Sequence, residues 1–137
     1  MVDAERLSRL LARVVRDVGE IRDTARSGDP LSDPVRLRAI KYGFVTAIEG
    51  CVRAAQHVVA AEHLAMPDSN AAAVRTLGAA GMVDVAVAES VALAVGFRNL
   101  LVHEYAEVDD SRVVANLELL GDLEAYVSQL ARWATQH

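Results

Sequence analysis

The chain has 137 residues, of which 53% are apolar and 24% charged, and its formal net charge is -5. This composition excludes an intrinsically disordered chain, and the length suffices for one domain with its own core. The negative charge disfavours bulk electrostatic binding to nucleic acid, so any such site must rest on a local basic cluster. Cys51 is the only cysteine, which excludes an internal disulfide, and its apolar neighbours predict that it is buried.

The sequence carries no pattern typical of a membrane span, an export signal or a metal centre. No apolar run reaches the ~18 residues that a membrane helix needs. The first ten residues, MVDAERLSRL, contain charges where a secretory signal has an apolar block, and no Cys and His pair has zinc spacing. We therefore expect a cytoplasmic protein with one domain, residues 1–137, and without membrane, metal or cofactor.

Apolar residues recur with helical spacing along most of the chain. A first helix is predicted over residues 3–25, where one face carries Leu7, Leu10, Leu11, Val14, Val15, Val18 and Ile21. The segment SGDPLSDP then indicates a loop, and Asp33 before Pro34 is a typical N-cap. A second helix is predicted over 34–64. Its length, on the order of 45 Å, exceeds what a small core needs.

Three further helices complete the predicted fold. A short helix is expected over 71–77, a long one over 84–105, and a last long one from Asp109 or Asp110 to residue 134. No strand alternation or hairpin turn competes with them. We therefore expect an all-α fold with four long helices and one short helix in an up-down bundle. The surplus apolar positions of the second helix predict a homodimer.

The segment GFRNLLVHEY, residues 96–105, places several polar residues at the end of an otherwise apolar helix. On one regular helix Arg98 and Tyr105 lie on nearly the same face, whereas His103 is turned by ~140° from Arg98. A straight helix therefore does not gather all three side chains. Either the helix loosens near its end, or a second subunit completes the cluster.

Each of these residues also has an ordinary structural interpretation. Arg98 can pair with a carboxylate such as Glu89 or Glu104. His103 can lie against the C-terminus of its helix, and Tyr105 can pack with its hydroxyl in water. For any one residue alone this interpretation is the more frequent one, so the spacing is more informative than the single residues.

The spacing Arg98, four residues, His103, one residue, Tyr105 resembles the Arg-x4-His-x-Tyr motif of the HEPN superfamily, and more closely the HepT-like toxins. The segment RNLLVHEY also resembles the Arg-Asn-x-Leu-Val-His-x-Tyr form common in that group. The resemblance extends over essentially the whole chain. It implies a metal-independent endoribonuclease, the toxin of a toxin-antitoxin system, in which two subunits form a shared cleft.

The resemblance also implies a role for each residue of the motif. Arg98 and His103 are expected to be catalytic, and Asn99 matches the polar residue that follows the arginine. Tyr105 matches the tyrosine to which a minimal nucleotidyltransferase antitoxin attaches AMP. The chemistry agrees, because histidine can transfer the proton of an RNA 2′-hydroxyl and arginine can neutralise a phosphate. DNA lacks that hydroxyl, so the expected substrate is RNA.

Two other polar groups have open interpretations. Arg36, Arg38 and Lys41 form the densest basic cluster and are candidates for RNA or partner contact, although a solvated helix start is at least as frequent. The second group consists of Glu49, Arg53 and His57, which are spaced four residues apart on one face of the second helix. Such a group is more often a ladder of surface charges than a functional site. A different function also stays open, that of a non-catalytic helical module that binds a nucleotidyltransferase or a nucleotide.

Overall fold

The computed structural model describes residues 2–137, and this part of the chain contains helices and no strand. The α-helices are α1 (Ala4–Arg26), α2 (Pro34–Ala61), α3 (Asn70–Ala79), α4 (Val85–His103), α5 (Asp110–Ala115) and α6 (Leu119–Gln136). Single 3-10 turns lie at Pro30–Ser32, Tyr105–Glu107 and Asn116–Glu118. The prediction of an all-α fold is confirmed.

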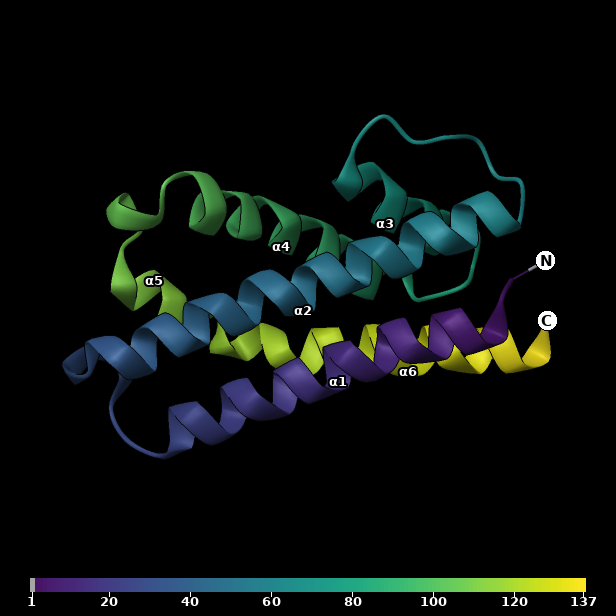
Figure 1. Cartoon of the computed structure of the whole chain (residues 1–137). Helices are drawn as coiled ribbons and strands as arrows, with labels where there is room; N and C mark the ends of the chain where they lie inside the picture. The colour runs from purple at the N-terminus through teal and green to yellow at the C-terminus, as the bar shows by residue number, and fades with distance from the viewer. Residues whose placement is uncertain (1) are drawn as a thin grey trace.

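The four long helices α1, α2, α4 and α6 run roughly along one direction, and both termini lie at the same end of the molecule (Figure 1). α1 packs along α2 and α6, while α4 packs against α2, α3 and α6. Between α2 and α4, the rings of Phe44 and Phe97 meet edge to face with their centroids 5.4 Å apart. Both rings are buried, so this contact helps to set α2 against α4.

Caps explain why most helix starts agree with the prediction. Asp3, Asp33 and Ser69 each accept a hydrogen bond from a backbone N–H in the first turn of α1, α2 and α3. The helix ends deviate more. α2 ends at Ala61, three residues before the predicted end, and α3 extends one residue further at its start and two further at its end.

The prediction of one long last helix is wrong. The segment forms α5 and α6, with the turn Asn116–Glu118 between them. Asp109 starts α5, since its side chain accepts from the backbone N–H of Ser111. α5 packs against the Pro30–Ser32 turn, whereas α6 packs along α1. Two separate packing partners require a change of direction, which a periodicity of apolar residues does not reveal.

The apolar helix α4 has the length and composition to cross a membrane. It instead contacts α2, α3 and α6, with seven buried residues along its length: Ala88, Val91, Ala92, Ala94, Val95, Phe97 and Leu101. A helix in the core of a soluble protein can have the same length and the same apolar composition. We therefore attribute the apolar character of α4 to its packing on three neighbours.

Two glycines bring α1 and α2 into close contact. A Cβ atom on Gly50 would lie 2.7 Å from Cγ2 of Val14, and one on Gly43 would lie 2.6 Å from Cγ1 of Ile21. Any larger residue would push the two helices apart. This contact occupies one side of α2 and leaves the opposite side for α4.

The single thiol is buried, as predicted. Cys51 is fully enclosed, and its carbonyl accepts a hydrogen bond of 2.9 Å from the hydroxyl of buried Tyr126. Burial raises the pKa of the Cys51 thiol to about 12. We expect a thiol reagent at pH 8 to leave the native protein unlabelled and to label the protein in denaturant completely. Rapid labelling of the native protein would show that this part of the core opens.

Candidate active site

Arg98 lies on the side of α4 that faces α2. Its Nη2 lies 3.5 Å from Oε2 of Glu49, and its Nη1 donates a hydrogen bond of 3.0 Å to Oδ1 of Asn99. Glu49 also pairs with Arg53 at 3.1 Å, so one carboxylate lies between two guanidinium groups. The side chain of Arg98 is 22% exposed. It is therefore held in place and still accessible to an anion.

The partner of Arg98 is not one of the two carboxylates suggested by the sequence. Glu89 instead accepts two hydrogen bonds from Arg75 of α3, at 2.8 and 3.0 Å, and these bonds lower the pKa of Glu89. Glu49 lies far from Arg98 in the sequence. The spacing of Glu49 and Arg53 predicted the ion pair between them, which is present. No local signal linked Glu49 to α4.

His103 lies at the C-terminus of α4, and its side chain is exposed. α4 stays helical up to this residue, so His103 is turned by ~140° around the helix axis from Arg98. Leu93 and Gly96 share the outward face of α4 with His103, and Leu93 is 64% exposed. One chain therefore places Arg98 and His103 on different faces of the same helix.

The chain leaves the helix at Glu104, where φ is -132° and ψ is 38°. The following 3-10 turn directs Tyr105 back toward α2. Nζ of Lys41 lies 4.5 Å from the centroid of the Tyr105 ring, and the same Nζ pairs with Asp110 of α5 at 3.1 Å. Tyr105 as a whole stays 43% exposed. The buried Lys41 thus connects α2, the Tyr105 turn and α5.

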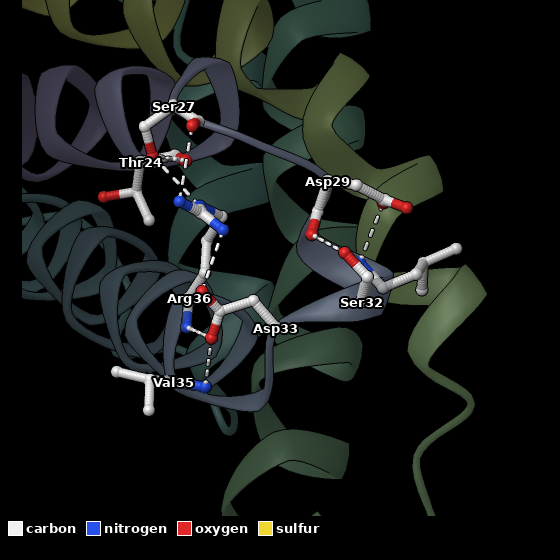
Figure 2. A network of polar contacts seen from close by, with 8 residues as sticks. Thr24, Ser27, Asp29, Ser32, Asp33, Val35 and Arg36 are labelled. Atoms are coloured by element: carbon white, nitrogen blue, oxygen red, sulfur yellow. Dashed lines mark hydrogen bonds and ion pairs between the residues drawn. The ribbon is translucent and has the colours of Figure 1, made fainter.

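The basic cluster predicted at the start of α2 does not form one patch. Arg36 donates to Oγ and to the carbonyl of Ser27 and pairs with Asp33 at 2.9 Å (Figure 2). Lys41 is buried against Tyr105. Arg38 is exposed, and within residues 2–137 its side chain has no ion pair or hydrogen bond. Of the three, only Arg38 is free for an outside partner.

Residues 11–130 match the sequence profile of the ribonuclease HepT-like family. The chain belongs to this family. No curated protein matches this HepT-like chain.

The residues described by the structure contain no group of three His, Cys, Asp or Glu side chains that could hold a metal ion.

Solved structures of toxin-antitoxin complexes share the fold of this HepT-like chain. A tri-AMPylated HEPN toxin of Shewanella oneidensis in complex with an MNT antitoxin has a TM-score of 0.84 and 21% identity, covering 95% of this chain and 98% of the other. A toxin-antitoxin complex with AMP-PNP has a TM-score of 0.83 and 20% identity, covering 95% and 99%. A tyrosine-to-alanine variant of MntA-HpeT has a TM-score of 0.83 and 19% identity, covering 90% and 96%.

Proposed function

We propose that this HepT-like protein is the toxin of a toxin-antitoxin system and a metal-independent endoribonuclease. The observation that carries the proposal is the arrangement at the end of α4, where Arg98 is held at one face and His103 is exposed five residues later. The two side chains supply a fixed positive charge and an imidazole that can accept and donate a proton. Membership in a family described as ribonucleases supports the reaction class.

In the proposed reaction, the 2′-oxygen of RNA attacks the adjacent phosphorus and the bond to the 5′-oxygen breaks. His103 accepts the 2′-hydroxyl proton, and the same residue of a second subunit donates a proton to the leaving oxygen. Arg98 neutralises the charge that develops on the phosphate oxygens. Asn99 accepts a hydrogen bond from Arg98 and so positions its guanidinium. The products are a 2′,3′-cyclic phosphate and a 5′-hydroxyl.

The proposal requires a homodimer, because one chain separates Arg98 and His103 by ~140° around α4. The outward face of α4 supports this pairing, since it carries exposed Leu93, a glycine at position 96 and half-buried Leu100 beside His103. Gly96 lets two helices approach closely. Leu93 is 64% exposed in one chain, so its burial against a second copy contributes about 1–2 kcal/mol per subunit.

We further propose that Tyr105 is the residue modified by a nucleotidyltransferase antitoxin. Its phenolic oxygen attacks the α-phosphorus of ATP, the bond to the β-phosphate breaks, and pyrophosphate leaves. Exposure of the ring and its contact with Lys41 support this role. An attached nucleotide brings negative charge and bulk to the site and so excludes RNA. The proposed location is the cytoplasm, where a single free thiol such as Cys51 stays reduced.

The test compares protein produced alone with protein produced together with an MNT nucleotidyltransferase. Alone, the chain is expected to be unmodified and to cut RNA. Together with the partner, it is expected to carry AMP on Tyr105 and to lose cleavage. Intact mass and sequencing of the modified peptide measure the first effect, and an RNA cleavage assay measures the second.

Two tyrosine variants make this test specific. Tyr105→Phe is expected to stay unmodified and active in the presence of the partner. The matched control Tyr42→Phe, which changes a tyrosine that is 71% exposed on α2, is expected to behave as wild type. Modification that persists in Tyr105→Phe would place the target elsewhere. An unmodified Tyr105 after co-production would remove this mechanism of inhibition.

A second candidate function is a non-catalytic module that binds a nucleotidyltransferase or a nucleotide. The ion pair with Glu49 favours it, because this carboxylate competes with a phosphate for the Arg98 guanidinium. In that case no purified form cuts RNA, even after removal of any nucleotide from Tyr105. The cleavage assay on unmodified protein therefore separates the two functions.

A further inference from the structure

A groove of about 240 Å³ lies between α2, α3 and α4 and reaches Arg98. Val52 and Val95, both buried, form an apolar part of its lining. The polar part of the lining consists of Glu49, Arg53, Gln56 and Asn70, together with Arg98. The groove is therefore continuous with the proposed active site and combines an apolar surface with hydrogen-bonding side chains.

Two amide side chains meet in the groove, away from Arg98. Nε2 of Gln56 donates a hydrogen bond of 3.1 Å to Oδ1 of Asn70. Among residues 2–137 these side chains have no other hydrogen bond, and both residues are exposed. The pair therefore leaves Oε1 and one N–H of Gln56 and both N–H groups of Asn70 unused. An unused acceptor next to unused donors suits a planar ligand with a complementary edge.

The spacing along α2 matches the size of one nucleotide. Gln56 lies seven residues after Glu49, whose carboxylate contacts Arg98, so the backbones of Glu49 and Gln56 are ~10 Å apart along the axis of α2. This distance is comparable with the span from a phosphate to the far edge of its base. The carboxylate of Glu49 repels a second phosphate inside the groove, whereas an uncharged base can lie against Val52 and Val95.

We propose that the groove binds the nucleotide adjacent to the scissile phosphate and that Gln56 and Asn70 select adenine at that position. Adenine presents an amino donor at N6 beside an acceptor at N7, and glutamine and asparagine amides pair with both atoms. The exposed edges of the two valines contact part of one face of the base. This inference rests on the proposed ribonuclease function, since it requires Arg98 to hold the phosphate of the same substrate.

The first experiment measures kcat/KM on short single-stranded RNAs that differ only in the bases on either side of the cut. Wild type is expected to prefer adenine at one of the two positions by roughly 5- to 150-fold. Gln56→Ala and Asn70→Ala are expected to lose this preference, because kcat/KM on the adenine-containing RNA falls to its value on the other RNAs. The matched control Gln136→Ala, an exposed glutamine near the C-terminus, is expected to keep it. A wild type without adenine preference, or a preference unchanged in both variants, would overturn the inference.

A second experiment keeps the inference separate from the proposed function. The side-chain amide signals of Gln56 and Asn70 are followed by NMR during titration with AMP and, in parallel, with UMP. We expect shifts with AMP that exceed those with UMP and that weaken in Arg98→Ala. Such shifts without any RNA cleavage would refute the ribonuclease function and retain the adenine site. Cleavage without adenine preference and without amide shifts would refute the adenine site and retain the ribonuclease.

Discussion

Replacement of His103 by alanine is expected to slow RNA cleavage by roughly 10²- to 10⁴-fold, the range for loss of a general acid or base. Arg98→Ala is expected to cost roughly 10²- to 10³-fold, because the charge on the phosphate is then not neutralised. His103 is exposed at a helix end, so its loss should leave the fold intact. Single-turnover cleavage of a labelled RNA measures both effects, and circular dichroism verifies folding.

Matched variants show whether these losses are specific. Arg9 pairs with Glu5 on the surface of α1, and His137 lies at the C-terminus. Arg9→Ala and His137→Ala are therefore expected to cut RNA at the wild-type rate. If His103→Ala and Arg98→Ala kept wild-type cleavage, the catalytic groups would lie outside the motif. A loss as large in the two controls would indicate an effect of surface charge alone.

Replacement of Leu93 by aspartate is expected to convert the proposed dimer into a monomer and to abolish cleavage. The change removes an apolar side chain that is 64% exposed on the outward face of α4 and places two like charges across the proposed interface. Loss of the two leucines from the interface alone weakens dimerisation by roughly 30-fold or more. Light scattering at micromolar concentration measures the mass of the assembly.

The matched control for this change is Val35→Asp. Val35 is 73% exposed in the first turn of α2, where a negative charge is favourable for the helix. This variant is expected to remain dimeric and active. A Leu93→Asp protein that stays dimeric would move the interface away from α4. A wild-type chain that is monomeric at micromolar concentration would contradict a site shared between two subunits.

The sequence by itself determined the helices and the motif. Apolar periodicity and the cap at Asp33 are local properties, because each depends only on residues of the helix itself or next to it. The spacing of Arg98, His103 and Tyr105 is local too, and together with the helix order it predicted the family that the chain belongs to. The break between α5 and α6 was not predictable in this way, because it follows from two different packing partners.

Only the tertiary structure decided which side chains meet the motif. Glu49 reaches Arg98, and Lys41 reaches Tyr105, because α2 and α4 lie side by side (Figure 1). The ring of Phe44 packs against that of Phe97 between these two helices. The sequence alone placed Glu49 in a ladder of surface charges and Lys41 in a basic cluster. Contacts between distant helices depend on how their apolar faces interlock, and a linear pattern carries no record of that arrangement.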